Sequence, residues 1–292
     1  MPEGAEVPPE MLSGGVINPD YIDPGGSILL NLYPLPNRDP AQNNGFNYIS
    51  SIVNPQHRAQ QRVRIDYNIS DNTKLYSAFN HEGETQPYPY TLWWDDPNQV
   101  PTPSRVLGKN RSYSISNSFV QVMNPTTTNE VTFSITYLNL PNWYENPEKV
   151  SRQALGYPYQ GVWKEGNDVI PNVTDWAGGV ATMYQPGGFD PILFANKWLI
   201  SGGDNFTRVQ GTHFLKFGAF FQLTTNSQPT SGADQGIVQP TNWGGNSTGN
   251  GYADLLLGRV GAYSEQTKNI VGDMRQRELS FYVQDSWKAT RR

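Results

Sequence analysis

The sequence predicts an all-β fold, namely a segment of an antiparallel transmembrane β-barrel, on three observations. Apolar and polar residues alternate with a period of two in seven stretches. Short polar turns join six of these stretches into pairs, and long connections rich in Gly, Pro, Asn and Trp separate the pairs. The composition agrees, because 28 Gly and 23 Pro in 292 residues exceed the usual share of turn formers, and 12% of residues are aromatic.

The first predicted hairpin has the clearest alternation. Its first strand covers Arg62–Ile69, where Val63 and every second residue after it are apolar. The short polar side chains of residues 70–73 predict a tight turn. The strand Lys74–His81 follows at once and completes the pair.

A second hairpin repeats this pattern at greater length. The strand Ser112–Met123 places serines on one face and apolar residues on the other, and residues 124–128 turn the chain. The returning strand Asn129–Leu140 alternates in the same way. Its apolar face is the one that we expect to contact lipid, through Val131, Phe133, Ile135 and Tyr137.

Three further strands complete the prediction. The strand Lys197–Val209, a turn at residues 210–212 and the strand His213–Thr224 form a third, weaker hairpin. A seventh strand is predicted over Leu279–Lys288.

The lengths of the connections distinguish a membrane barrel from a soluble sheet. The turns within pairs have 4, 5 and 3 residues, whereas the connections between pairs have 30, 56 and 54 residues (82–111, 141–196 and 225–278). Structureless connections beyond about 15 residues are uncommon in compact soluble domains. Outer-membrane barrels have short periplasmic turns and long extracellular loops. We therefore expect residues 1–61 to be an extended surface loop that leads into a partial barrel at 62–292.

Composition and motifs argue against several other classes of protein. The net charge of −5 includes no basic block, so nucleic acid is not an expected partner. The chain has no cysteine, and His57, His81 and His213 lack metal-ligand spacing. We find no catalytic or cofactor-binding motif. The sequence thus predicts neither an enzyme nor a metal or cofactor site.

Tryptophans in the long connections are candidate ligand contacts. Trp93, Trp94, Trp143 and Trp243 could stack on sugars or other solutes at the surface. The alternative, which we favour, is that these rings pack the loops into a compact cap.

Several segments, in the right order, resemble a known family. They include Leu30–Asn37, Arg64–Asp71, Gly211–Gly218, Ala253–Gly258 and Phe281–Lys288. Together they are similar to the barrel of Oar-like TonB-dependent outer-membrane receptors. The resemblance implies a place in the outer membrane, contact with its lipid, and uptake of an unknown solute.

The resemblance also implies a partner in the inner membrane. Such receptors are driven by a TonB-type energy-transducing complex, which engages a plug and an N-terminal box that have no counterpart in this chain. Full barrels of this type have about 22 strands, so seven readable strands suggest a fragment. The rival interpretation is a secreted soluble β-sandwich that binds a carbohydrate-type ligand through loop tryptophans.

Overall fold

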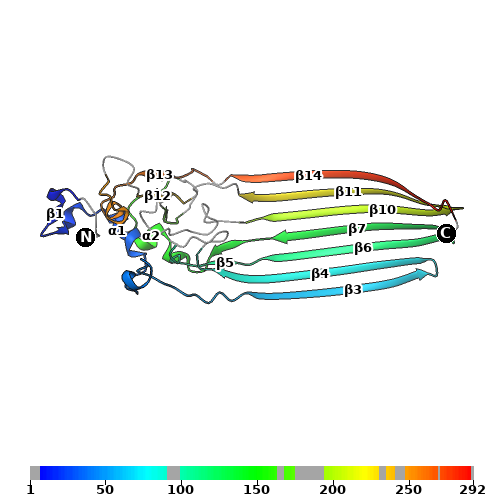
Figure 1. Cartoon of the computed structure of the whole chain (residues 1–292), viewed down its shortest axis with the longest axis horizontal. Coiled ribbons are helices and arrows are strands. Elements are labelled where there is room, and N and C mark those ends of the chain that lie inside the picture. The colour runs from blue at the N-terminus through cyan, green and yellow to red at the C-terminus, as the bar shows by residue number, and fades with distance from the viewer. Residues whose placement is uncertain are drawn as a thin grey trace.

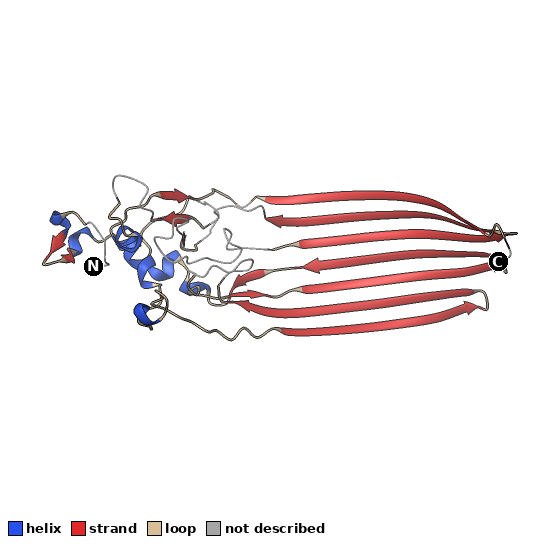
Figure 2. Cartoon of the chain, in the orientation of Figure 1, coloured by secondary structure: helices blue, strands red, loops and turns tan. Residues whose placement is uncertain are grey.

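A computed structural model shows one long sheet with a layer of loops and short helices at one end (Figure 1). The structure describes residues 7–90, 99–162, 168–174, 194–229, 235–240, 247–268 and 270–290. The helices all lie in the loop layer, and the long strands extend away from it (Figure 2).

Seven long strands form the sheet, each antiparallel to its neighbour in sequence. They are β3 (His57–Ser70), β4 (Thr73–Tyr88), β6 (Arg111–Asn124), β7 (Thr127–Asn139), β10 (Asn196–Gln210), β11 (His213–Pro229) and β14 (Val271–Trp287). Among the described residues, β3 and β14 are the two edges of this sheet. The predicted antiparallel fold, with all seven strands, is confirmed.

The strands are longer and the turns tighter than the side-chain pattern predicts. Ser70 pairs with Thr73, Asn124 with Thr127 and Gln210 with His213, so each turn has two central residues. Gly211 has a φ of +60°, which glycine adopts without a steric cost. Backbone hydrogen bonds continue through polar residues that carry no alternation, which is why the pattern alone predicts the strands too short.

The loop layer contains the short elements. They are η1 (Pro9–Met11), β1 (Leu12–Ser13), β2 (Val16–Ile17), η2 (Pro19–Tyr21), α1 (Pro24–Asn31), η3 (Pro40–Gln42), β5 (Val106–Gly108), β8 (Asn142–Tyr144), η4 (Pro147–Lys149), α2 (Arg152–Leu155), β9 (Asn172–Val173), β12 (Ile237–Gln239), α3 (Gly251–Leu256) and β13 (Ala262–Ser264). Strands β5 and β8 continue the pairing of β6 and β7 into the loop layer, where β5 pairs with the end of β4 and β8 pairs with β5. Strand β12 pairs with β13 and β9 in a separate small sheet.

The buried core of the described chain lies in this layer and not between the long strands. It consists of Leu29, Val100, Val106, Tyr144, Val150, Val169, Ile170, Val173, Val238 and Leu255. These residues come from segments far apart in sequence, so the loops form a packed body. None of the described helices is long and apolar enough to cross a membrane.

Helices α1 and α3 pack against each other within the core. Asp23 caps α1 by accepting a hydrogen bond from the Gly26 backbone N–H at 2.5 Å, and Pro24 follows as the first helical residue. A Cβ on Gly26 would lie 1.8 Å from the Leu255 carbonyl oxygen. Glycine is therefore required for this close approach.

The division of the chain at residues 61 and 62 stays a prediction.

Candidate functional site

Cross-strand register gathers most of the apolar residues of β4, β6 and β7 on one face of the sheet. Directly paired residues point to the same side, and Phe79, Ile115, Ile135 and Ile200 form one such row across four strands. A second row on the same face joins Leu75, Phe119 and Val131. We call this surface the apolar face.

A row of aromatic rings crosses the apolar face near the loop layer. His81 stacks on Tyr113 with ring centroids 4.6 Å apart, and Tyr137 lies 4.5 Å from Trp198. Tyr113 and Tyr137 are 6.5 Å apart and nearly parallel, which makes the row continuous from β4 to β10. Membrane barrels place aromatic rings at this level, where hydrocarbon meets headgroups.

All four predicted lipid contacts lie on this face of β7. Val131 and Phe133 are 43% and 46% exposed, whereas Ile135 and Tyr137 are half-buried between neighbouring side chains. The register therefore brings the four residues together, as the alternation predicts.

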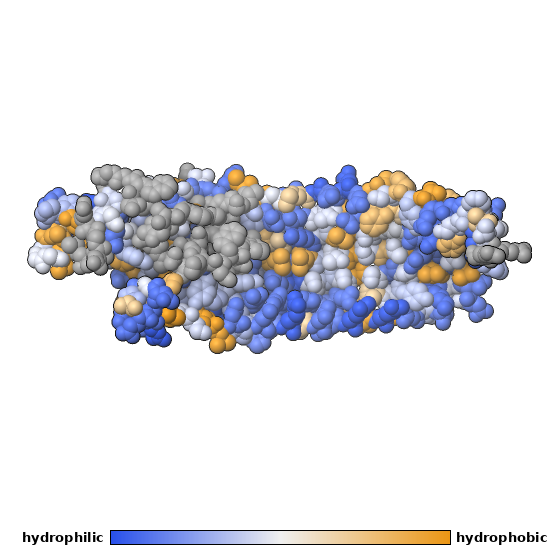
Figure 3. Space-filling view, viewed as in Figure 1, coloured by the Kyte–Doolittle hydropathy of each residue, from blue (hydrophilic) through white to orange (hydrophobic). Residues whose placement is uncertain are grey.

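The opposite face of the same strands is largely polar. Ser116, Ser134 and Ser201 lie side by side on β6, β7 and β10, and the Ser134 and Ser201 hydroxyls are 2.7 Å apart. Asn80 donates a hydrogen bond to Ser114 on the same face at 3.1 Å. In the view of Figure 3, hydrophobic patches over the strands alternate with hydrophilic side chains, which dominate along the β3 edge.

A buried polar network holds the loop layer together around Arg152. Its guanidinium donates to the Val169 carbonyl at 2.8 Å and to the Gln235 carbonyl at 2.7 Å. It also lies 3.4 Å from the Glu265 carboxylate, and the two side chains are only 7% and 3% exposed. The Tyr144 hydroxyl donates to Gln235 at 3.1 Å, so the network reaches into the core.

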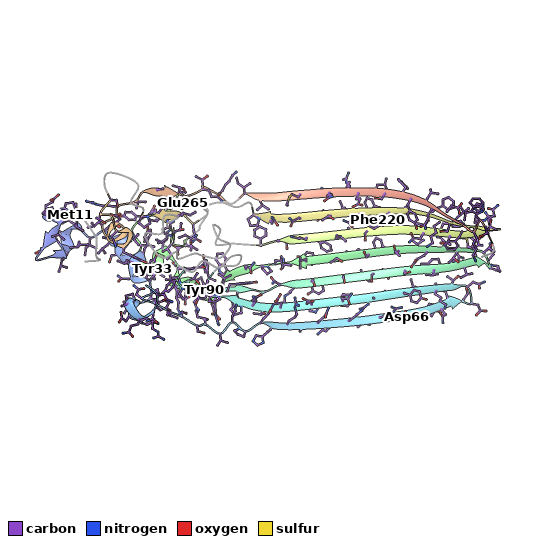
Figure 4. All side chains as sticks on the ribbon, in the orientation of Figure 1. Met11, Tyr33, Asp66, Tyr90, Phe220 and Glu265 are labelled. Atoms are coloured by element: carbon purple, nitrogen blue, oxygen red, sulfur yellow. The ribbon has the colours of Figure 1, made fainter. Side chains whose placement is uncertain are left out.

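An open cavity of about 310 Å³ lies beside this network. Its lining comes from α1, α3, β12, β13 and the chain around residues 157–162. Glu265, at one side of it, lies within the loop layer, whereas Asp66 and Phe220 lie far along the strands (Figure 4). The lining residues are Asp23, Gly26, Leu29, Tyr157, Tyr159, Gln160, Val162, Val238, Leu255, Gly258, Val260, Tyr263 and Glu265.

Three of the lining residues are tyrosines, and their hydroxyl groups stay protonated. Burial is the main cause that raises the pKa of Tyr157, and it raises the pKa of Tyr263 to about 12 with help from the hydrogen bond to Glu265. The Tyr159 hydroxyl donates to Asp23, and this bond raises the pKa of Tyr159. All three hydroxyls are therefore neutral donors at physiological pH.

The predicted loop tryptophans are only partly within the described chain. Trp143 lies on β8, is 44% exposed, and packs edge-on against Tyr144 with ring centroids 5.5 Å apart. It does not line the cavity. Trp93, Trp94 and Trp243 lie outside the described residues.

The histidines belong to strands and not to a cluster. His81 lies inside β4, and His213 opens β11, where it contacts Asp285 at 2.7 Å and stacks on Trp287. No group of three or more potential metal ligands occurs among the residues that the structure describes.

Analysis of the sequence alone does not identify the residues of the cavity and its network. Tyr157 and Tyr159 flank a proline in a segment with no periodicity, and Asp23, Arg152 and Glu265 are far apart along the chain. The repeated Tyr at alternate positions was the one local signal that could have drawn attention to this segment.

Comparison with known proteins places the chain in a family. A family model described as an outer membrane beta barrel domain matches residues 4–292. Among solved structures, the chain is similar to the outer membrane transporter YddB from Escherichia coli, with 10% identity and a TM-score of 0.46. That match covers 84% of this chain and 27% of the transporter, while no curated protein matches. This chain belongs to the outer membrane beta barrel domain family and is a segment of an antiparallel transmembrane barrel in the outer membrane.

Proposed function

We propose that this chain is part of the barrel of a TonB-dependent, Oar-like receptor that takes up a solute across the outer membrane. The family membership supports the barrel, and the ordered segments from Leu30–Asn37 to Phe281–Lys288 support the Oar-like relationship. A secreted soluble β-sandwich is set aside, because the chain belongs to an outer-membrane family.

The observation that carries the proposal is that the two faces of the sheet and the loop layer differ in chemical character. One face of the sheet is apolar, the opposite face is polar, and a packed loop layer with an open cavity caps one end. A transporter wall needs all three features: contact with lipid, a wettable interior and a surface that receives solute.

We propose that Val131, Phe133, Ile135 and Tyr137 contact lipid. Each buried apolar side chain of this size contributes about 1.5–3 kcal/mol of transfer free energy. The aromatic row that includes Tyr137 and Trp198 then marks the headgroup level on the side of the loops.

We further propose a non-catalytic role with two partners. The solute contacts the loop layer, and the TonB-type complex in the inner membrane supplies energy through the plug and N-terminal box of the receptor. Among the tryptophans proposed as solute contacts, Trp143 is the one whose surroundings are described, and its half-exposed ring is available at the surface.

Solute depletion by living cells tests this function. Cells with and without the intact gene are grown in the same defined medium, and the solutes left in the medium are measured with and without a protonophore. We expect at least one solute to be removed only by cells that carry the gene, and only when the proton gradient is intact. Equal depletion by both strains, or a difference that survives the protonophore, would contradict energy-coupled uptake.

A further inference from the structure

The tyrosine rings around the loop-layer cavity are held in place by glycines. A Cβ on Gly25 would lie 2.4 Å from the ring of Tyr159 and 3.2 Å from that of Tyr157. A Cβ on Gly236, whose φ is +96°, would lie 2.5 Å from the Tyr263 hydroxyl. The rings therefore rest directly on backbone, and little side-chain entropy remains to be lost when a ligand packs against them.

These fixed rings remain open to solvent on their other side. Tyr159 and Tyr263 are 49% and 47% exposed, although each hydroxyl is already hydrogen-bonded to a carboxylate. Val162 and Val260 add apolar surface between them. An exposed aromatic surface backed by hydrogen-bonded polar groups suits a ligand with both apolar C–H surface and hydroxyl groups.

Both lining carboxylates already have hydrogen-bond partners within the protein. Asp23 accepts from the Gly26 N–H at the N-terminus of α1, where the helix dipole favours a negative charge. Glu265 lies against Arg152 and also accepts from the Val162 N–H at 3.0 Å. Because Glu265 is paired with Arg152 and Asp23 already accepts two hydrogen bonds from the protein, we infer that a neutral ligand suits the cavity better than an ion.

The Asp23 carboxylate can still accept further hydrogen bonds, because each of its oxygens accepts one bond, from the Gly26 N–H or from the Tyr159 hydroxyl. Each carboxylate oxygen has two lone pairs, and the Gln160 amide at the rim adds both a donor and an acceptor. The volume of about 310 Å³ is at the lower end of ligand pockets, so the occupant is small.

We propose that this cavity binds a neutral sugar unit, with its ring packed on Tyr159 and Tyr263 and its hydroxyls bonded to Asp23 and to the Gln160 amide. The inference rests on the proposed receptor function and names the class of solute. It assigns the main contact to the tyrosines and not to the loop tryptophans.

An oligosaccharide array tests the inference. The full-length protein, purified from outer membranes in detergent, is applied to an array of neutral and acidic oligosaccharides, and tetramethylammonium binding is measured separately. We expect binding to at least one neutral sugar. Tyr263→Ala and Tyr159→Ala should each weaken it at least tenfold, Tyr263→Phe should weaken it less because the ring remains, and Tyr21→Ala, an exposed tyrosine outside the cavity, should leave it unchanged.

Three outcomes would overturn the inference. They are binding to no neutral sugar, tighter binding of acidic sugars or of tetramethylammonium, and neutral-sugar binding that both alanine variants retain within twofold. The Tyr159→Ala variant removes a half-exposed rim ring, so it keeps the test valid if Tyr263→Ala does not fold. Binding to purified protein does not depend on energy coupling, so loss of the receptor function would appear in the depletion assay alone.

Discussion

The ring of Tyr282 on β14 covers Gly218 on β11, its direct partner in the sheet. A Cβ on Gly218 would lie 1.9 Å from the Tyr282 ring. The Tyr282 hydroxyl continues across β11 and donates a hydrogen bond to Asn205 on β10 at 2.9 Å. One aromatic side chain thus connects three neighbouring strands, and glycine makes room for it, as in other sheets where an aromatic ring covers a glycine.

This contact predicts a severe effect of Gly218→Ala. The methyl group would displace the ring and break the bond to Asn205, and overpacking of this kind costs about 1–3 kcal/mol. Gly202→Ala is the matched control, because its Cβ would meet its nearest neighbour, the Thr132 carbonyl oxygen, at an ordinary 3.5 Å. Thermal unfolding of the purified barrel checks this. Equal midpoints for the two variants would show that the ring is not seated on Gly218.

The effect of an arginine substitution on barrel assembly should depend on which face of β7 carries it. Phe133→Arg places a charge on the apolar face, where it costs about 2–4 kcal/mol near the bilayer midplane, and should reduce the amount of assembled barrel in the outer membrane. Ser134→Arg, on the polar face beside Ser201, should be tolerated. Heat-modifiable migration on gels measures assembly. If both variants assemble equally well, the apolar face is not the lipid-facing one.

Removing the cation of the buried ion pair in the loop layer should destabilise the protein far more than removing the cation of an exposed pair. Arg152→Met leaves the Glu265 carboxylate buried without its cation, which costs about 3–5 kcal/mol. Arg105→Met removes an exposed pair with Glu145 and should cost about 0–1 kcal/mol. Limited proteolysis of the loops measures both. Protease resistance that is unchanged in Arg152→Met would show that the network does not hold the layer.

The loop layer should weaken at alkaline pH. Burial raises the pKa of Tyr144 well above its ordinary value of 10.0. A raised folded-state pKa means that the stabilisation is complete below about pH 10 and is lost as the pH rises through the folded-state pKa. We expect the stability of the loop layer to fall above pH 10, with a smaller slope in Tyr144→Phe. Proteolysis across pH 8–12 tests this, and identical slopes would contradict it.

The sequence predicted the strands because alternation is a local signal. Val131 to Tyr137 show their common face without reference to any other strand. The beginning of β14 was missed because Val271–Glu278 has no apolar alternation, and its place in the sheet depends on backbone pairing with β11. The turns were predicted too long for the same reason, because the polar residues at the strand ends pair through the backbone and show no alternation.

The loop layer could not be predicted in this way. The cavity brings Asp23, Tyr159 and Glu265 together, and Arg152 reaches Glu265 across more than a hundred residues. Such contacts follow from how distant segments pack and not from any spacing within a segment. A buried core lies in the loop layer, and tyrosines line its cavity among the described residues. That the loop tryptophans pack this layer stays a prediction.

We expect one face of the strands to contact lipid and the other to contact water, and β7 allows this to be measured directly. The chain has no cysteine, so single cysteines at residues 130–137 of β7 can carry a spin label without a competing thiol from this segment. In intact outer membranes, we expect labels at Val131, Phe133 and Ile135 to be relaxed mainly by oxygen, which partitions into lipid. Labels at Thr132, Ser134 and Thr136 should respond instead to a water-soluble nickel complex. A pattern with no period of two, or with the two faces exchanged, would show that the apolar face does not contact lipid.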